Sequence, residues 1–420
     1  MLEIPRKIIT KAYTTRIKEC LLEEKIISKY QFCHPGKLIH ENIHTVNFLI
    51  EKAKRKKTSL HLAFLDFAKA YDRTNFQFLN HLLTKRKASK NCLNFINTFL
   101  KGKSKINFDN CLSDELEIKR GVPQGETLSP FLFILAINSL LKTIQNDKSI
   151  KGVKVGNKNI KILAYADDIV LISDNPNDIQ KMLTHVKNYE KASNAKLNER
   201  KSQILSFGNE IIENIGEIKQ AVEVRHLGFF FNKKGIINNI DSILDKIKNK
   251  LKIISKLFPI FTIKVNIWKS YAISSLLYQS EIIVIEDYQI DKFEKIEKLF
   301  LFHNTKNFDN LNEDTNEKFP FKSKVSLERL QLPKKYGGMN LRKIEDIFSA
   351  SKSKILMRIF EKENNLKPLN ILLLEKIEKI YNSFPINDCL HPLFSVDEFR
   401  KNEKNWKWFE QANLIYSKID

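Results

Sequence analysis

The stretch AYADDIVLI, residues 164–172, places two adjacent acidic residues between apolar flanks. A tight turn over residues 166–168 would join two antiparallel strands and present Asp167 and Asp168 at the tip of the hairpin. Two carboxylates this close repel each other unless a cation neutralises them. Mg²⁺ suits such a position because it prefers oxygen ligands and keeps coordination positions for phosphate oxygens. The alternative is a structural Asp-Asp pair that caps backbone N–H groups at a turn.

A second apolar segment also ends in an acidic residue. LHLAFLDF, residues 60–67, is short and almost continuously apolar, which favours a buried strand over a helix. Asp66 comes at the end of this strand and would supply a third carboxylate. Three carboxylates can hold two metal ions, one activating an attacking hydroxyl and the other stabilising a leaving oxygen. A pair that only caps a turn needs neither the apolar strands nor this third residue, so the pattern favours catalysis.

The charge of the chain indicates a polyanionic partner. Its 420 residues include 71 Lys plus Arg against 49 Asp plus Glu, giving a formal net charge of +22. Nucleic acid is the first candidate, although ribosomal, chromatin and membrane-surface proteins are also basic. An AT-rich genome, which enriches Lys, Ile and Asn, would raise the charge without any selection for binding.

Cysteine usage and hydropathy limit the cellular context. The five cysteines contain no CxxC pair, so neither a disulfide framework nor a zinc ribbon is indicated, and a reducing, intracellular compartment is expected. The longest apolar stretch, residues 131–141, is too short to span a bilayer. The first residues lack the apolar core of a signal peptide. We therefore expect no membrane partner.

The order of predicted elements indicates an α+β fold. Helices over residues 7–30 and 41–55 precede the strand at 60–67, and helices follow around residue 78 and over 128–142. The hairpin, a helix over 177–193 and the strands QILSFG and VRHLGFFFNKKG come next. This order is typical of an antiparallel sheet backed by helices. From residue 238 the chain is predicted to be mostly helical. The segment 303–319 is rich in Asn and Asp, and we expect it to be a loop or linker.

Three motifs together resemble a known family. YADD, with LDFAKAYD (65–72) and GVPQGETLSP (121–130), is similar to the catalytic core of reverse transcriptases, and most of all to the non-LTR, LINE-type retrotransposon polymerase. QFCHPGKLIHENI, KLNERKSQIL, HLGFFF and LPKKYGGMNLRKIEDIFSASKSKILMRIF extend the resemblance in the expected order. It implies a right-hand polymerase with fingers, an antiparallel-sheet palm and a helical thumb. The implied divisions are fingers over 1–57, truncated at the N-terminus; palm with part of the fingers over 58–236; thumb over 237–320; and a helical C-terminal region over 321–420.

The resemblance also assigns roles around the carboxylates. Asp66, Asp167 and Asp168 would be the catalytic residues and, with the Phe67 carbonyl, would hold two Mg²⁺ ions, for which Mn²⁺ could substitute. The nucleotide-binding residues would be Phe67, Ala68, Lys69, Ala70, Tyr71, Gln124 and Lys201. Among these, Tyr71 would reject a ribose 2′-hydroxyl by its size, the alternative being ordinary core packing.

Further residues would contact template and primer. Gly125 permits close backbone approach, and His226, Leu227 and Gly228 would form a primer grip, the alternative being a plain sheet-edge strand. The basic runs 52–57 and 85–90 suit a backbone-tracking groove or a nuclear-import signal, against the default of a solvated helix face. Trp406 and Trp408 could stack on bases, although helix packing is favoured for them.

The function implied is an RNA-directed DNA polymerase that extends a primer 3′-hydroxyl with dNTPs. Its partners would be an RNA template, a DNA primer or nicked target DNA, and dNTPs, at a nuclear site of action. Departures from the family pattern are Glu126-Thr127 in place of Asp-Pro, Lys37 in place of arginine, a missing upstream arginine and no endonuclease. A truncated relic that binds RNA or RNA/DNA hybrid is therefore a second hypothesis. An RNA-dependent RNA polymerase is a third, which the bulk of Tyr71 disfavours.

Overall fold

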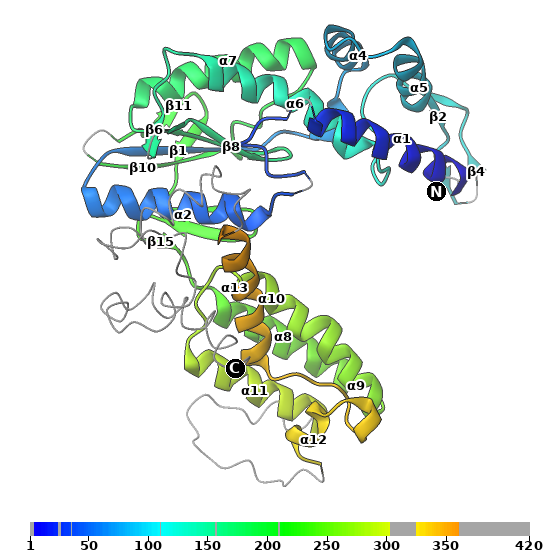
Figure 1. Ribbon diagram of the computed structural model, residues 1–420, viewed down its shortest axis with the longest axis vertical. Helices are drawn as coiled ribbons and strands as arrows, with labels where there is room; N and C mark the ends of the chain where they lie inside the picture. The colour runs from blue at the N-terminus through cyan, green and yellow to red at the C-terminus, as the bar shows by residue number, and fades with distance from the viewer. Residues whose placement is uncertain are drawn as a thin grey trace. The chain divides into compact units, whose positions relative to one another are not determined.

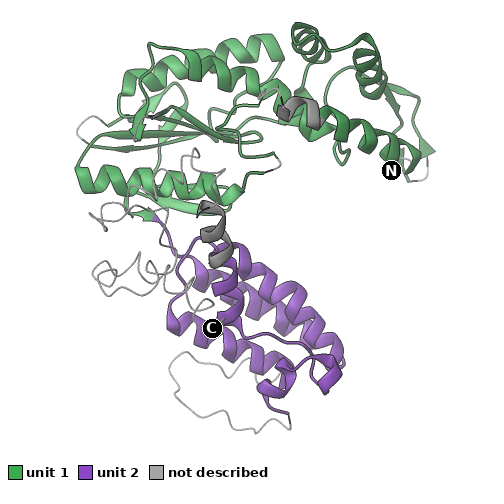
Figure 2. Ribbon diagram, viewed as in Figure 1, with its two compact units in different colours: residues 1–235 green, residues 236–420 purple. Residues whose placement is uncertain are grey.

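The computed structural model describes residues 4–23, 27–34, 36–109, 111–155, 158–208, 211–302 and 325–360. The chain divides into two compact units, residues 1–235 and 236–420 (Figure 2). The predicted linker 303–319 and the tryptophans Trp406 and Trp408 lie outside the described residues. The predicted division into fingers, palm and thumb remains a prediction.

A six-stranded sheet forms the centre of the first unit, in the order β11-β12-β10-β1-β9-β8. The strands are β1 (Leu60–Leu65), β8 (Ile162–Tyr165), β9 (Asp168–Ser173), β10 (Gln203–Phe207), β11 (Asn214–Ile215) and β12 (Ile218–Gln220). The central strand β1 pairs antiparallel with both β9 and β10, and all six of its residues are buried. The sheet departs from the predicted antiparallel order at one place, because β10 and β12 are parallel.

Helices cover both faces of this sheet (Figure 1). The helices α6 (Ser129–Asn146) and α7 (Pro176–Ser193) lie on one face, and α2 (Ile39–Lys56) lies on the other. Most residues of α6 are buried because the helix is apolar on nearly every side. Burial on both faces explains why β1 reads as a continuous apolar run rather than an alternating one.

Shorter elements complete the first unit. They are α1 (Ile4–Glu23), α3 (Ala70–Arg73), α4 (Phe76–Lys85), α5 (Lys90–Leu100), β2 (Gly102–Ser104), β3 (Asn107–Phe108), β4 (Cys111–Leu112), β5 (Leu116–Ile118), β6 (Val153–Val155), β7 (Lys158–Ile160), β13 (Glu223–His226), β14 (Phe229–Asn232) and β15 (Gly235–Ile236). The prediction of one helix over residues 7–30 was wrong at its end, because residues 27–30 form a bend and a turn and are not helical. Gln31 instead forms a parallel bridge with Ala164, which gives the outer edge of β8 hydrogen-bond partners.

The second unit is helical over its described residues. It contains α8 (Ile240–Ser255), α9 (Phe261–Ile267), a π-helical turn (Trp268–Ile273), α10 (Ser274–Ser280), α11 (Asp287–Phe302), α12 (Leu327–Gln331), a 3₁₀ turn (Lys334–Tyr336) and α13 (Ile344–Phe360). The buried stripe of α8, which includes Leu244 and Leu251, belongs to a helix that packs against α11. Trp268 is fully buried and stacks on Phe293 of α11, with the ring centroids 4.7 Å apart.

None of the helices described in either unit has both the length and the apolar character that crossing a lipid bilayer requires.

Candidate active site

The register of the sheet brings the three predicted carboxylates together. Leu65, the last residue of β1, pairs with Ile169 of β9. Extending this antiparallel register by one residue places Asp66 opposite Asp168, and side chains opposite each other emerge on the same face of a sheet. Tyr165 pairs with Asp168, so the connection between β8 and β9 consists of two residues, of which Asp167 is the second. All three carboxylates therefore lie at one end of the sheet.

The carboxyl groups at this end of the sheet affect one another's ionisation. Burial raises the pKa of the half-buried Asp167, and the negative charge of Asp66 raises it further. Asp168 is an exposed residue, but its carboxyl group is partly desolvated. This desolvation is the largest cause that raises its pKa to about 6, and the negative charges of Asp167 and Asp66 add to it. A group of like charges with raised pKa values would be stabilised in its ionised form by a bound cation.

The donor set fits a divalent metal in its chemistry. Carboxylate oxygens are the ligands that hard divalent cations prefer, and such a cation would offset the repulsion among the three groups. The side-chain positions, however, do not converge. Within the ranges that the structure describes, no group of three or more His, Cys, Asp or Glu side chains is placed to hold an ion. Uncompensated like charges favour such separation, so metal binding would require the carboxylates to turn toward a common point.

The predicted nucleotide-binding segment is fixed by backbone pairing. The Ala68 N–H donates to the Lys196 carbonyl at 2.8 Å, and the Asn198 N–H donates to the Asp66 carbonyl at the same distance. Lys69 then adopts a left-handed conformation, with φ of 48°, before α3 begins. The strand β1 is thereby continued past its last residue and turned sharply, which presents residues 66–70 beside the hairpin tip.

Lys201 lies on the surface just beyond this pairing. It is exposed, in the turn that leads into β10. Its neighbour Arg200 forms an exposed ion pair with Glu217, with 3.0 Å between Nε and the carboxylate oxygen. The nucleotide-binding role of Lys201 remains a prediction. The ion pair with Glu217 engages its neighbour Arg200, so the two adjacent cations differ in their surroundings.

The ring of Tyr71 packs against a second aromatic ring. Its side chain stacks on Phe133 of α6, with the ring centroids 4.7 Å apart and an interplanar angle of 17°. Tyr71 remains partly exposed, and burial of its hydroxyl raises its pKa to about 12, so the phenol stays protonated at neutral pH. The stacked ring restricts the tyrosine to one orientation, as a steric gate against ribose would require.

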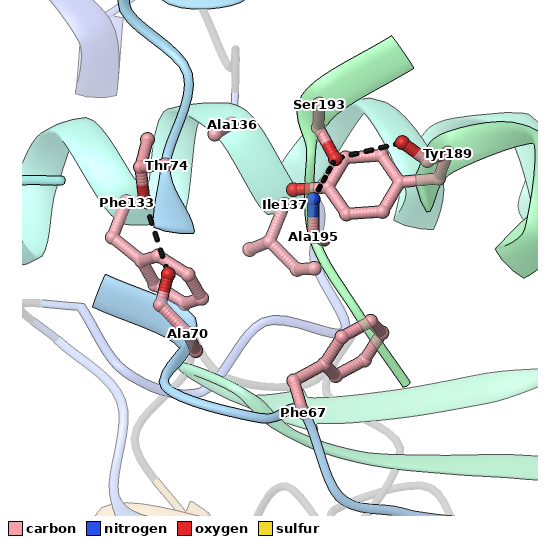
Figure 3. Close-up of a pocket in the computed structure, with 9 residues that line it drawn as sticks. All are labelled: Phe67, Ala70, Thr74, Phe133, Ala136, Ile137, Tyr189, Ser193 and Ala195. Carbon is pink, nitrogen blue, oxygen red and sulfur yellow. Dashed lines mark hydrogen bonds between the residues drawn. The ribbon is translucent and has the colours of Figure 1, made fainter. Parts of the chain in front are cut away.

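A small pocket lies behind the nucleotide-binding segment (Figure 3). Its lining combines the segment with α6 and the end of α7, and consists of Phe67, Ala70, Thr74, Phe133, Ala136, Ile137, Tyr189, Ser193 and Ala195. The hydroxyl of Ser193 donates to the Tyr189 carbonyl and accepts from the Ala195 N–H, which closes the end of α7. The pocket is mainly apolar and belongs to the packing that supports residues 67–71.

The GVPQG loop docks against α3. The Val122 N–H donates to the Tyr71 carbonyl at 2.9 Å. Gly121 has φ of +90°, and a Cβ built on it would lie 2.8 Å from the Asp72 carbonyl oxygen. Only glycine therefore fits this approach. Gln124 is exposed and donates from Nε2 to Asp72 Oδ1 at 3.3 Å, so the loop brings Gln124 next to the helix that carries Tyr71.

A buried carboxylate in the same motif was not predicted to have a structural role. Glu126 is 2% exposed and accepts hydrogen bonds from Arg6 Nε at 3.0 Å and from Thr10 Oγ1 at 2.8 Å. Arg6 also donates to the Phe99 carbonyl. The interaction joins α1 to the loop that carries Gln124. The substitution of the family's Asp-Pro by Glu126-Thr127 was the sequence signal at this position.

His226 is buried, and its ring lies against α2. Its ring is 4% exposed and lies 3.2 Å from Asn42 Oδ1 of α2, measured from Nε2. Burial lowers its pKa to about 3, so the imidazole is neutral. Leu227 and Gly228 form the turn that follows, with φ of 48° and 84°, and both are partly exposed. A primer could therefore meet this turn, whereas the imidazole holds the hairpin onto α2.

The roles of the other predicted site residues remain predictions, and the structure gives their surroundings. Gly125 is exposed with φ of +87°, and a Cβ built there would contact nothing within 4 Å. Residues 67–71 follow Asp66 directly, and Tyr71 lies within reach of the charge of Asp167. Gln124 lies beside Asp72 of α3. Two residues that bear on the site were not singled out from the sequence, namely Phe133 and Gln31.

Comparison with known proteins agrees with this arrangement of polymerase motifs. Residues 1–231 match the family model described as reverse transcriptase (RNA-dependent DNA polymerase). This segment is more than half of the chain and includes the sheet, the hairpin and the GVPQG loop. The chain therefore belongs to the reverse transcriptase family, whose members generally use divalent metals, and its α+β fold is that of a right-hand polymerase.

The relatives are proteins of mobile elements. The Transposon TX1 uncharacterized 149 kDa protein of Xenopus laevis is 29% identical over 50% of this chain and 16% of its own length. The Pol polyprotein of the type-2 retrotransposable element R2DM of Drosophila melanogaster is 27% identical over 53% of this chain and 23% of its own. The RNA-directed DNA polymerase from mobile element jockey of Drosophila funebris is 27% identical over 54% of this chain and 26% of its own. These relatives confirm the resemblance to LINE-type polymerases, although the matched segment spans only about a quarter of their length or less.

Among solved structures, the chain is similar to the telomerase of Candida albicans in complex with a TWJ fragment of telomeric RNA. The TM-score is 0.44 at 10% identity, over 90% of this chain and 55% of that one. A likeness this low assigns no function.

Proposed function

We propose that the protein is an RNA-directed DNA polymerase of a LINE-type retroelement. The observation that carries this proposal is the register of β1 with β9, which places Asp66 opposite Asp168 and beside Asp167 in a chain of the reverse transcriptase family. The charges of the three carboxylates interact, and the pKa values of Asp167 and Asp168 are raised. Such a group suits the electrostatic work of nucleotidyl transfer, in which positioning and charge stabilisation provide most of the catalysis.

The metal would be Mg²⁺, as two ions, with Mn²⁺ able to substitute. Asp66, Asp167, Asp168 and the Phe67 carbonyl would hold them, and when bound they would activate the primer 3′-hydroxyl and stabilise the leaving oxygen. The chain itself would orient the substrate. The backbone of residues 67–70 would receive the triphosphate, and Tyr71, held against Phe133, would contact the deoxyribose.

The proposed partners are an RNA template, a DNA primer or nicked target DNA, and dNTPs. The net charge of +22 favours binding to nucleic acid. The turn at Leu227 and Gly228 would hold the primer, since the buried ring of His226 fixes the turn on α2. A polymerase that copies at a chromosomal nick acts in the nucleus, and exclusion of a fluorescent fusion from the nucleus would contradict that site of action.

The proposal is tested by extension of a labelled DNA primer on an RNA template with Mg²⁺ or Mn²⁺. Wild type is compared with Asp167→Asn, which removes one charge at the hairpin tip. We expect extension by wild type and a loss of about 100- to 1000-fold in rate for the variant, because an electrostatic contact at the reacting centre is lost. Binding of an RNA/DNA hybrid should change much less.

Asp174→Asn is the matched control. Asp174 is an exposed carboxylate just after the other end of β9, far along the strand from the tip. The same chemical change there should leave extension at the wild-type rate. Equal activity of wild type and Asp167→Asn would contradict the assignment of the site. No extension by wild type, with hybrid binding retained, would instead favour a nucleic-acid-binding relic.

A further inference from the structure

The turn that carries the catalytic pair depends on an unfavourable backbone conformation. Ala166 is the first of the two residues between β8 and β9, and its φ is +52°. A residue with a Cβ is destabilised in this left-handed region by about 1 kcal/mol. Ala166 is also buried, at 8% exposure. Its N–H and C=O lie at the turn, outside the ladder between the strands, so they require partners from elsewhere in the protein.

Gln31 provides both partners from a distant part of the chain. Its Oε1 accepts a hydrogen bond from the Ala166 N–H at 3.0 Å, and its Nε2 donates to the Ala166 carbonyl at 3.5 Å. The same Oε1 accepts from the Cys33 N–H at 3.0 Å. Two N–H donors converging on one oxygen fix which way the amide faces. The side chain is 0% exposed, so water does not compete for these contacts.

The backbone around Gln31 is itself held to the hairpin. The Phe32 N–H donates to the Ala164 carbonyl at 2.8 Å, and the Ala164 N–H donates to the Tyr30 carbonyl at 2.9 Å. The segment 30–32 thus forms a short parallel pairing along the outer edge of β8. The amide of Gln31 is therefore carried on a rigid element, as precise positioning of a neighbouring group requires.

We propose that Gln31 is a positioning residue for nucleotidyl transfer: its side-chain amide holds Ala166 in the left-handed conformation that directs Asp167 and Asp168. The inference rests on the proposed polymerase function. Gln31 hydrogen-bonds to the backbone of Ala166, the residue before the two carboxylates, and would act through that backbone. Without the amide, the turn would relax toward a conformation that Ala166 prefers, and the direction of both carboxylates would change.

The test compares wild type with Gln31→Met, which keeps the length and approximate volume of the side chain but removes the hydrogen bonds. We expect kcat for primer extension to fall by about 10- to 100-fold, since small displacements of catalytic groups reduce rates by such factors. KM for dNTP should stay within about twofold, because the backbone hydrogen bonds that fix residues 66–68 come from residues 196 and 198 and do not involve Gln31. A loss of packing alone would affect both constants or neither.

Hydrogen exchange of the Ala166 amide gives a second readout that does not depend on activity. In wild type the Ala166 N–H is protected by Gln31, and Gln31→Met should accelerate its exchange by at least about tenfold. Tyr30→Phe is the matched control in the same segment, because it removes only the bond from the Tyr30 hydroxyl to the Asn159 carbonyl. This control should keep wild-type kcat and wild-type exchange.

The possible outcomes separate the two proposals. A folded Gln31→Met protein with wild-type kcat, or with unchanged exchange at Ala166, would overturn the positioning role. If Gln31→Met does not fold, Gln31→Asn serves instead, because its amide stays polar but is one methylene too short to reach both groups of Ala166. If wild type itself fails to extend primers, faster exchange in the variant would still support the contact with the turn, while the polymerase function would be rejected.

Discussion

At the scale of single residues, Tyr71 is the side chain whose role can be tested most directly. It is partly exposed and stacked on Phe133, so its removal would open space beside the incoming sugar without exposing a buried charge. We expect Tyr71→Ala to lower the preference for dNTP over NTP by about 10- to 100-fold, which is the range that pocket shape can supply. The measurement is kcat/KM for both nucleotides on the same primer and template. Extension by wild type must be observed first.

Tyr71→Phe is the control for this prediction. It keeps the ring and the stacking on Phe133 and removes only a hydroxyl, so sugar selection should stay close to wild type. A discrimination ratio that is the same in wild type and Tyr71→Ala would show that Tyr71 serves core packing, which is the alternative that the sequence left open.

At the scale of elements, the attachment of α1 depends on Glu126. The side chain of Glu126 is fully buried, and the side chain of Arg6 is 35% exposed. Arg6→Ala would leave a buried carboxylate whose remaining side-chain hydrogen-bond donor, among the described residues, is the hydroxyl of Thr10. We expect it to lower the free energy of unfolding by about 1–3 kcal/mol. Adding Glu126→Gln should recover part of that loss, because the uncompensated charge is removed. Urea denaturation of the single and double variants measures the coupling.

The exposed pair of Arg200 with Glu217 is the control for this cycle. Its side chains are 83% and 59% exposed, at the same Nε to oxygen distance of 3.0 Å as in the pair of Arg6 with Glu126. Arg200→Ala should change stability by no more than about 0.5 kcal/mol, since solvent screens exposed ion pairs. Equal losses for Arg6→Ala and Arg200→Ala would show that burial of Glu126 is not what anchors α1.

At the scale of the whole molecule, the stability of the second unit should depend on pH through one buried carboxyl group. Glu297 of α11 is 5% exposed, and burial, with a smaller effect of Glu294, raises its pKa from 4.5 to about 7, against an opposing effect of Lys298. Between these pH values the folded state retains a proton that the unfolded state has released. Stability therefore falls as pH rises from about 4.5 to 7 and then levels off, by a total of about 3 kcal/mol.

Glu297→Gln should remove this dependence. We expect the variant to match wild type near pH 4.5 and to be more stable at pH 8, as measured by urea denaturation followed by tryptophan fluorescence. All three tryptophans of the sequence lie within residues 236–420, so the signal reports on the second unit. Asp291→Asn, at an exposed position on the same helix, is the control. An identical pH dependence in wild type and Glu297→Gln would exclude Glu297 as its source.

The parts of the fold that the sequence predicted are those with a local physical signature. Continuous burial marks β1, and alternation around a short turn marks the hairpin of β8 and β9. The carboxylates followed from the same local patterns, because each comes at a strand end. The predicted end of the helix at residue 30 was wrong because the pairing of residues 30–32 with Ala164 replaces helical hydrogen bonds, and apolar periodicity does not report such a partner.

The supporting contacts of the site could not be predicted because they join residues far apart in the chain. Gln31 is separated from Ala166 by 135 positions, and Thr10 from Glu126 by 116. The contact of His226 with Asn42 could not be predicted for the same reason, because the two residues are 184 positions apart in the chain. Each of these side chains is polar, and nothing in its immediate neighbours indicates whether it meets solvent, substrate or another helix.

The pairing of residues 30–32 with the edge of β8 has a consequence for how the protein is made. Residue 31 leaves the ribosome 135 residues before its partner on the turn. At synthesis rates of about 5–20 residues per second, that interval is on the order of 10 s. Throughout this time the early segment has no strand to join, and its unpaired backbone could pair with another chain. The catalytic end of the sheet thus cannot be completed until the hairpin has been made, and chaperone protection of the early segment would matter most during that wait.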